Sequence, residues 1–191
     1  HGIKNDKERK KRYLSCIQHI LSLLKNNNSN IYTIIVENNG IRQTYLDDLD
    51  CDVFYTNNNK TKNFYKGINE LCDIKDVISN YKINDDDMII KLTGRYKILD
   101  FSFISLIESN PNNNAFIRFF DVYSQCNKKD DCVLGLFAIK CKFLKDFNYN
   151  GKDSSEREFA KYINECVSSV MEVQKLSLEC CLGDDLSIVY V

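Results

Sequence analysis

Helix and strand patterns alternate through the first hundred residues, and this alternation constrains the fold more than any other feature. Apolar residues recur at helical spacing over 7–25 and again over about 65–82. The runs 31–36, 52–56 and 88–92 have the length of strands and are rich in aliphatic and aromatic residues. Strands that alternate with helices are typical of a parallel sheet with helices on its faces. We therefore expect a three-layer α/β/α fold with a mostly parallel central sheet.

The sequence of the second half predicts a larger share of strands than that of the first half. We expect a short helix over 101–109 that ends near Pro111, two strands over 115–123 and 132–140, a long helix over 154–172 and a strand within 186–191. No Gly/Ser-rich linker, repeat or change of composition divides the 191 residues. A chain of this length suits one domain and can bury a core. We expect a single domain over 1–191.

Charge and hydropathy exclude several classes of protein. The formal net charge is −1, which gives no general attraction to nucleic acid. No apolar run approaches the roughly 20 residues that cross a bilayer. The segment 4–12 is charged where a signal peptide would be apolar. We expect a cytoplasmic protein with no nucleic-acid partner and no transmembrane segment; the sequence does not indicate an oligomeric state.

The nine cysteines favour a reduced interior over a metal site. No two of them form a CxxC pair, and the chain has only two histidines, so a zinc site is not expected. Several lie among apolar neighbours, which is typical of thiols in the core of an intracellular protein. Cys126 and Cys132 bracket a polar loop and are the pair best placed for a disulfide.

Polar side chains directly follow two of the predicted strands. Glu37, Asn38 and Asn39 come after the first apolar run, and Asn57 follows the second. In parallel sheets ligands bind beyond the carboxyl ends of the strands. These side chains could therefore hydrogen-bond a base or a ribose. The alternative for Asn39-Gly40 is a plain turn.

Gly67 lies at the start of the second predicted helix, directly after Lys66. A glycine there lets a ligand approach the backbone, and the N-terminus of a helix favours phosphate. The alternative is a loop glycine that precedes the helix and binds nothing.

The sharpest signal is the segment Lys91-Leu92-Thr93-Gly94-Arg95-Tyr96 at the end of the third strand. Lysine is rare in a buried strand unless something pairs with it. Lys91 and Arg95 flank a Thr93-Gly94 turn, which could present two cations and a hydroxyl to a diphosphate. The segment through Tyr96 is thus the predicted diphosphate site. The alternative is a structural salt bridge that closes the sheet.

Acidic residues are candidates for two roles. Asp85-Asp86-Asp87 resembles a metal-binding DxD motif, but it precedes the third strand and is interpreted as a solvated turn. Glu156 shares the inward face of Phe159 in the late helix, so its carboxylate could be a general base. Glu158 is expected to point toward solvent. The alternative is that both glutamates only favour the first helical turn, behind a serine cap.

Several of these segments together resemble the small glycosyltransferases of giant algal and amoebal viruses, which belong to the nucleotide-diphospho-sugar transferase superfamily with the GT-A fold. The matching pieces are 34–39, 53–58, 66–71 and 90–96, with looser matches at 135–138 and 156–163. The resemblance implies a Rossmann-like GT-A domain. Its first half, about 1–100, would bind a nucleotide-sugar donor, often a UDP-sugar. Its second half, about 101–191, would meet a glycan or other hydroxyl acceptor.

Two departures from that family bear on the cofactor. The usual strand before the first helix is not visible, and Thr93-Gly94-Arg95 replaces the acidic pair that holds a metal. We expect no cofactor, because Lys91 and Arg95 can neutralise the leaving diphosphate in place of Mn²⁺ or Mg²⁺. If a metal is used, Asp121 or Asp184-Asp185 would have to hold it.

Two other functions stay open at this point. A nucleotidyltransferase can share the architecture, but it usually has a Gly-rich basic loop after its first strand, and this sequence has none. A non-catalytic interaction or structural protein on a degenerate transferase fold would explain the missing acidic pair.

Overall fold

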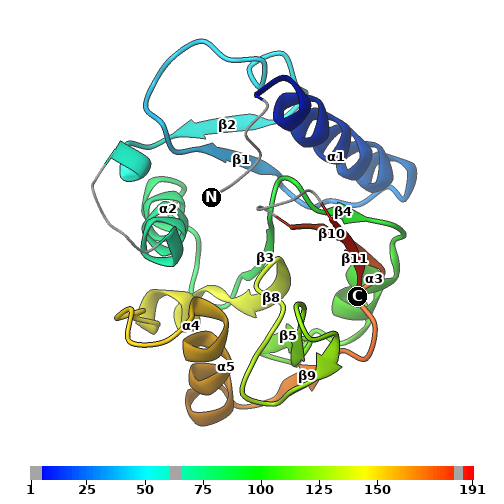
Figure 1. Cartoon of the computed structure of the whole chain (residues 1–191), viewed down its shortest axis with the longest axis vertical. Coiled ribbons are helices and arrows are strands. Elements are labelled where there is room, and N and C mark those ends of the chain that lie inside the picture. Colours follow the sequence, from blue (N-terminus) through cyan, green and yellow to red (C-terminus); the bar gives the residue numbers. More distant parts are fainter. Residues whose placement is uncertain (1–5, 61–65, 183–186) are drawn as a thin grey trace.

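The computed structural model describes residues 6–60, 66–182 and 187–191 (Figure 1). Helix α1 (Asp6–Asn26) leads to β1 (Ile34–Glu37), and β2 (Asp52–Tyr55) pairs with β1 in parallel. A 3-10 turn, η1 (Asn58–Lys60), follows β2. These elements confirm the predicted first helix and the parallel pairing of the first two strands.

The remaining elements build three further sheets. In chain order they are α2 (Lys66–Asn80), β3 (Met88–Leu92), β4 (Lys97–Ile98), α3 (Ser102–Ser109), β5 (Ala115–Ile117), β6 (Phe120–Asp121), β7 (Cys126–Asn127), β8 (Leu136–Lys140), α4 (Cys141–Asp146), α5 (Ser155–Cys166), β9 (Val170–Glu172), β10 (Leu178–Cys181) and β11 (Ile188–Tyr190). Helix α5 begins behind Ser154, whose hydroxyl accepts a hydrogen bond from the Arg157 amide. The serine cap that the sequence suggested is therefore present.

The central sheet is not the mostly parallel sheet that the sequence predicts. Its order is β3-β8-β5-β9, and β8 runs antiparallel to both of its neighbours. Among the described pairings of this sheet only β5–β9 is parallel, and β1 and β2 form a separate parallel pair. The prediction is wrong because no helix separates β5 from β8, and a chain that returns without a crossover helix pairs antiparallel. The expected Rossmann-like GT-A arrangement of three layers is not what the chain forms.

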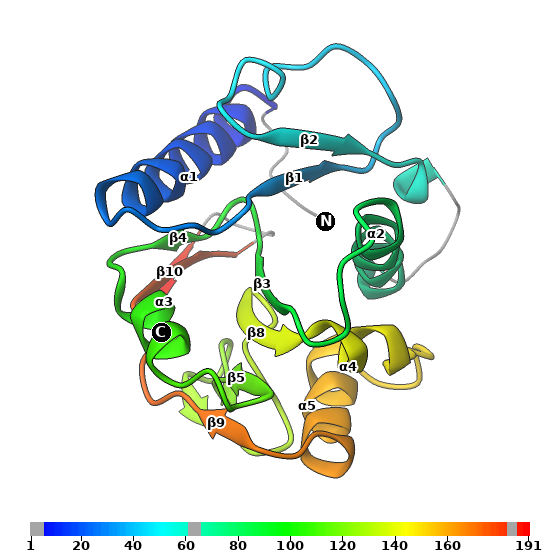
Figure 2. The same cartoon turned by 180° about the vertical axis from the view of Figure 1, so that it is seen from behind.

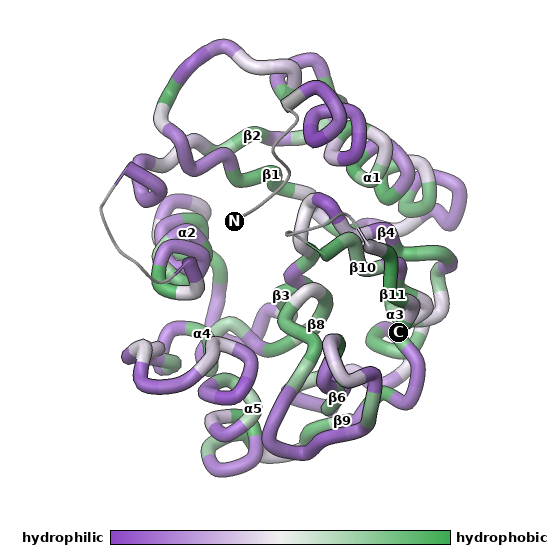
Figure 3. The backbone as a smooth tube through the Cα atoms, viewed as in Figure 1, coloured by the Kyte–Doolittle hydropathy of each residue, from purple (hydrophilic) through white to green (hydrophobic). Residues whose placement is uncertain are grey.

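Buried side chains gather in two clusters, one on each face of this sheet. Phe137 and Ile139 of β8 pack against α2, α4 and α5. Leu136 and Ala138 lie on the other face, with α3 and the small antiparallel sheet β11-β10-β4. Successive residues of a strand point to opposite faces, so the apolar run of β8 supplies both clusters. Figures 1 and 2 show α4 and α5 on one flank and α3 on the other, and Figure 3 shows hydrophobic residues concentrated on β8, β10 and β11.

Several predicted boundaries in the second half are wrong. The helix expected over 154–172 ends at Cys166, and the following apolar residues form β9, which pairs with β5. Pairing in the sheet overrides their helical spacing. The strand expected over 115–123 is divided into β5 and β6, and the one expected over 132–140 begins only at Leu136.

Each of the nine cysteines lies in a described segment, and each is a free thiol. The candidate bridge between Cys126 and Cys132 is not formed. Cys126 is exposed on the β6–β7 hairpin, whereas Cys132 is buried and its thiol donates to the Glu156 carbonyl at 3.1 Å. Cys166, the last residue of α5, is also exposed. Across the described ranges, no helix combines the length and the apolar character needed to cross a membrane.

Candidate functional site

The polar residues at the ends of β1 and β2 form a hydrogen-bonded network around Asp73 of α2. Asp73 is only 6% exposed. Its carboxylate accepts hydrogen bonds from Asn38 Nδ2 at 2.8 Å, Thr56 Oγ1 at 2.6 Å and Asn58 Nδ2 at 2.8 Å. Three neutral donors thus satisfy a buried carboxylate, which ties α2 to both strand ends.

Glu37 and Asn39 form a second part of this strand-end region. Glu37 Oε1 accepts hydrogen bonds from the Asn39 amide at 3.0 Å and from Asn39 Nδ2 at 2.6 Å. Arg42 Nη2 lies 3.3 Å from the same oxygen, and Asn59 Nδ2 donates to Asn39 Oδ1 at 2.6 Å. The predicted base-binding residues at the end of β1 lie side by side, but many of their donors and acceptors are already hydrogen-bonded within the cluster.

Gly40 closes a tight turn over the end of β2. Its φ is 90°, in the region that favours glycine, and its amide donates to the Thr56 carbonyl at 2.7 Å. A Cβ at Gly40 would lie 2.7 Å from Asn57 Oδ1 and 2.5 Å from Lys60 Nζ. Asn57 therefore packs on the turn, which is the plain-turn alternative for Asn39-Gly40.

Gly67 lies where the N-terminus of α2 meets the N-terminus of α5. A Cβ there would lie 2.8 Å from Ser155 Cβ and 2.9 Å from the Tyr149 ring. Close helix packing thus accounts for this glycine without a ligand. Glu156 follows at once, and its Oε2 accepts a hydrogen bond from Ser155 Oγ at 3.1 Å. The fold therefore brings the candidate base next to the start of α2.

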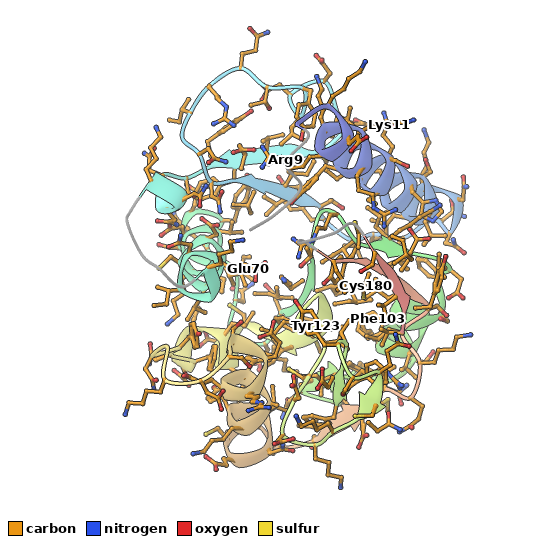
Figure 4. The ribbon with its side chains drawn as sticks, viewed as in Figure 1. Arg9, Lys11, Glu70, Phe103, Tyr123 and Cys180 are labelled. Atoms are coloured by element: carbon orange, nitrogen blue, oxygen red, sulfur yellow. The ribbon has the colours of Figure 1, made fainter. Side chains whose placement is uncertain are left out.

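Lys91 places its ammonium among three oxygens. Its Nζ donates to the Leu134 carbonyl at 2.6 Å and to Thr93 Oγ1 at 2.8 Å, and Glu70 Oε1 lies 3.0 Å away. The Lys91 side chain is 11% exposed, whereas that of Glu70 is 48% exposed. Figure 4 shows Glu70 on the side of α2 that faces the middle of the molecule. The ion pair joins β3 to α2, as the structural alternative for Lys91 supposed.

Arg95, in the turn after β3, has mainly neutral partners. Its Nε donates to the Cys181 carbonyl at 2.8 Å, and its guanidinium carbon lies 5.2 Å from the centre of the Tyr96 ring. Burial lowers the pKa of Arg95, but the neighbouring Tyr96, Tyr13 and Glu70 raise it, and the net pKa lies above its usual value. None of the described residues forms an ion pair with this charged, half-buried guanidinium.

Gly94 and Tyr96 support the turn rather than face solvent. A Cβ at Gly94 would lie 3.1 Å from the Tyr13 ring, and one at Gly135 would lie 2.0 Å from Tyr96 Cε2. Tyr96 belongs to the core, and burial raises its pKa to about 12. Of the predicted diphosphate site, Lys91, Thr93 and Arg95 therefore remain the side chains that a ligand could meet.

Glu158 has a structural place that the sequence did not suggest. Its carboxylate accepts hydrogen bonds from the amides of Asn150, Lys152 and Asp153. Burial raises the pKa of Glu158, but the three amides outweigh it, and the net pKa lies below its usual value. Glu158 closes the loop before α5 and does not simply point toward solvent.

Asp131 is a carboxylate near Glu156 that the sequence did not single out. Its side chain is 13% exposed; Oδ1 accepts from the Cys132 amide at 2.8 Å, and Oδ2 lies 3.8 Å from Arg157 Nε. Burial raises the pKa of Asp131, the Cys132 amide lowers it, Asp121 and Glu156 raise it further, and the net pKa lies above its usual value. A carboxylate with a raised pKa is a candidate proton acceptor. In the sequence it is only one of several acids in a polar loop.

The remaining acids that the structure describes do not gather into a metal site. Asp85 and Asp86 lie in the turn before β3 and pair with two lysines of α4. Asp121 accepts hydrogen bonds from two amides of the β6–β7 hairpin, and Asp184 and Asp185 lie outside the described residues. Within the part of the chain that the structure describes, no group of three or more His, Cys, Asp or Glu side chains could hold a metal ion.

Two hollows lie along α2. The smaller, of about 40 Å³, lies between α2, β3, β8 and α5, and its lining includes the polar side chains of Glu70, Lys91, Tyr149 and Ser155. It is much smaller than the roughly 300 Å³ of a small-molecule pocket. The larger, of about 400 Å³, lies at the C-terminal end of α2 and is lined by Lys75, Ile78, Ser79, Lys82, Ile83 and Lys145. None of these six residues was predicted to bind a ligand.

No family model matches the chain, and no curated protein matches it. Three solved chains match, among them "Crystal Structure of A197 from STIV". That alignment covers 82% of this chain and 91% of the other, with 11% sequence identity and a TM-score of 0.46. A likeness of this size assigns neither a fold nor a function to the chain.

Proposed function

We propose that the chain is a glycosyltransferase that binds a nucleotide-diphosphate sugar, such as a UDP-sugar, and transfers the sugar to a glycan or other hydroxyl acceptor. One observation carries the proposal: Arg95 keeps a charged guanidinium half-buried, with no described carboxylate paired to it. Burying such a cation is costly unless an anion lies beside it. Lys91, at the end of the same strand, has Glu70 as its charged partner. Two cations this close in sequence suit the two phosphates of a donor.

The proposed transfer first requires that the negative charge on the leaving diphosphate be stabilised. When the bond to the sugar breaks, the nucleotide diphosphate leaves with additional negative charge, and preorganised cations lower the energy of that state. Arg95 is held by the Cys181 carbonyl and Lys91 by the Leu134 carbonyl, so neither needs to reorganise greatly when charge develops. In this proposal Thr93 positions the Lys91 ammonium, because its hydroxyl accepts from Lys91 Nζ.

An inverting transfer also needs a proton acceptor for the acceptor hydroxyl. Glu156 is the proposed base, since its carboxylate lies beside Ser155 at the start of α5 and α2 begins next to it. Asp131 is the second candidate because it is near Glu156 and has a raised pKa. Glu156→Gln and Asp131→Asn are each expected to keep donor affinity, and the true base is the one whose variant loses turnover.

The residues after β3 do not fit a divalent metal. The turn offers the Thr93 hydroxyl and the Arg95 cation, where oxygen-rich anionic ligands would be needed. We therefore propose that the donor binds without Mn²⁺ or Mg²⁺, and that Lys91 and Arg95 are the described cations that meet the diphosphate. Calorimetric titration of a UDP-sugar with and without EDTA tests this, and loss of binding in EDTA would refute it.

Thermal unfolding in the presence of nucleotides tests the proposed function. A ligand that binds only the native state raises the Tm. UDP, GDP and CDP and their sugars should be compared at equal concentration, and one nucleotide family should raise the Tm while the free base and sugar do not. If no nucleoside diphosphate or nucleotide sugar raises the Tm, the proposal is wrong.

The larger hollow favours a second candidate, a non-enzymatic protein that binds an acidic partner. Lys75, Lys82 and Lys145 line it, away from the turn after β3. An acidic peptide of Asp and Glu, titrated into the protein at low and high salt, separates the two functions. Salt-sensitive binding of the peptide that Lys82→Ala weakens, together with no binding of nucleotides, would favour the second candidate.

A further inference from the structure

Glu70 is the ion-pair partner of Lys91, one of the two cations of the proposed diphosphate site. Its Oε1 is 3.0 Å from Lys91 Nζ, and Glu70 is among the groups that raise the pKa of Arg95. The carboxylate thus lies in the field of both cations of the proposed site, Lys91 of β3 and Arg95 of the turn after it. An anionic group of a ligand that binds Lys91 would therefore compete with the Glu70 carboxylate for the same ammonium.

The two partners of this ion pair differ in freedom. Lys91 is fixed by the Leu134 carbonyl and Thr93 Oγ1, and its side chain is 11% exposed. Glu70 is on the surface of α2, and its side chain is 48% exposed. A half-exposed carboxylate can turn into water at little cost, because water then solvates its charge in place of the ammonium. The ammonium must stay where it is, so Glu70 is the member that a ligand can replace.

We propose that Glu70 is a specificity-determining residue of this site: its carboxylate occupies the place of a ligand's anionic group in the free protein and is displaced when that group binds Lys91. The inference rests on the proposed function, because it takes the turn after β3 to be the diphosphate site. It goes further in naming the class of ligand. With Glu70 in place the cluster of Glu70, Lys91 and Arg95 carries a net charge of about +1, and a ligand with one phosphate offers a single anionic group, which can replace Glu70 at Lys91 but leaves Arg95 without a partner. A diphosphate brings enough charge to engage Arg95 and also replace Glu70.

The test compares inorganic phosphate, inorganic pyrophosphate and UDP by calorimetric titration into the parent chain and into Glu70→Gln. The variant keeps the size of the side chain and removes its charge. It should bind pyrophosphate and UDP about three- to tenfold more tightly, and the preference for pyrophosphate over phosphate should shrink. Glu165→Gln, at an exposed position of α5, removes the same charge elsewhere and should change no affinity.

The outcomes separate the inference from the proposed function. If pyrophosphate and UDP bind the parent but Glu70→Gln binds them equally or more weakly, Glu70 is a structural partner of Lys91 and the inference is overturned. If Glu70→Gln tightens pyrophosphate but no UDP-sugar is turned over, the inference stands and the transferase function fails. If no ligand binds either protein, both are overturned. Thermal unfolding of Glu70→Gln confirms that the variant is folded.

Discussion

The ends of β1 and β2 and the end of β3 look alike in the sequence, since each has a cluster of polar residues after an apolar run. In the structure they differ. At β1 and β2 the buried Asp73 is satisfied by three side-chain donors, and Glu37 and Asn39 bind each other. At β3 Lys91 pairs with the half-exposed Glu70 carboxylate, and none of the described carboxylates forms an ion pair with Arg95. A polar cluster whose groups are hydrogen-bonded to one another stabilises the fold, whereas a cluster with an excess of positive charge can bind an anionic ligand.

The largest expected effect is a loss of stability when the hydrogen-bonded network at the ends of β1 and β2 is broken. Asp73→Ala removes the acceptor of three donors, and we expect a loss of about 2–4 kcal/mol in the free energy of unfolding. Urea denaturation measures it. Asp76→Ala is the matched control, because exposed Asp76 accepts one side-chain hydrogen bond within the described ranges, from Asn58 Nδ2 at 2.8 Å, and its loss should cost less than about 1 kcal/mol. Equal losses in the two variants would mean that the network is not the structural support described.

Arg95→Ala is expected to act on binding. It removes one cation from the proposed diphosphate site, and UDP affinity should fall about tenfold to a hundredfold, since charge-assisted contacts contribute roughly 1.5–3 kcal/mol. Calorimetric titration gives the affinity. Arg42→Ala removes an arginine from the β1 end instead and serves as the control for net charge. If both variants bind UDP as the parent does, the two strand ends do not differ in the way proposed.

A smaller effect is expected from the ion pair at the end of β1. The Arg42 side chain is largely exposed, and its Nη2 lies 3.3 Å from Glu37 Oε1. Arg42→Ala should therefore lower the free energy of unfolding by no more than about 1 kcal/mol, and 0.5 M salt should reduce the difference. Urea denaturation at two salt concentrations is the measurement. A larger, salt-independent loss would show that Arg42 supports the network by packing.

The smallest effect concerns pH. Asp131 has a pKa above its usual value in the folded chain, so between the usual and the raised pKa the folded state binds more protons than the unfolded state. Asp131 therefore costs stability as pH rises through that window, and the cost is absent below it. Asp131→Asn should gain stability relative to the parent at pH 7 compared with pH 3. Urea denaturation at both pH values tests this, with exposed Asp130→Asn as the control, and an unchanged difference would contradict it.

The first half of the fold was predictable, and much of the second was not. The apolar spacing of α1 and the strand lengths around β1, β2 and β3 depend on local periodicity, which the sequence records directly. The order β3-β8-β5-β9 depends on contacts between distant segments. β9 shows the limit most clearly, because its apolar residues continue the spacing of α5 and yet pair with β5.

The candidate site divides in the same way. Lys91 and Arg95 could be singled out because a cation at the end of a buried strand is unusual in any sequence. Tyr96 could not be assigned to the core, since it packs against distant segments, among them the one that contains Gly135. Glu70 and Asp131 stand out only when their neighbours are known. Whether the β1 residues or the β3 turn bind a nucleotide stays a prediction.

The free thiols give the chain its own reporter of motion. Cys132 is buried beside Asp131 and Glu156, and burial raises its pKa well above the usual value, so an alkylating reagent can modify it only when the thiol becomes exposed. Cys126 and Cys166 are exposed and would react first. After those two are capped, the slow phase of maleimide labelling at Cys132, followed by mass spectrometry, would measure how often the segment between β7 and β8 exposes this thiol. Ligands of the site could then be ranked by how much they lower the labelling rate of Cys132.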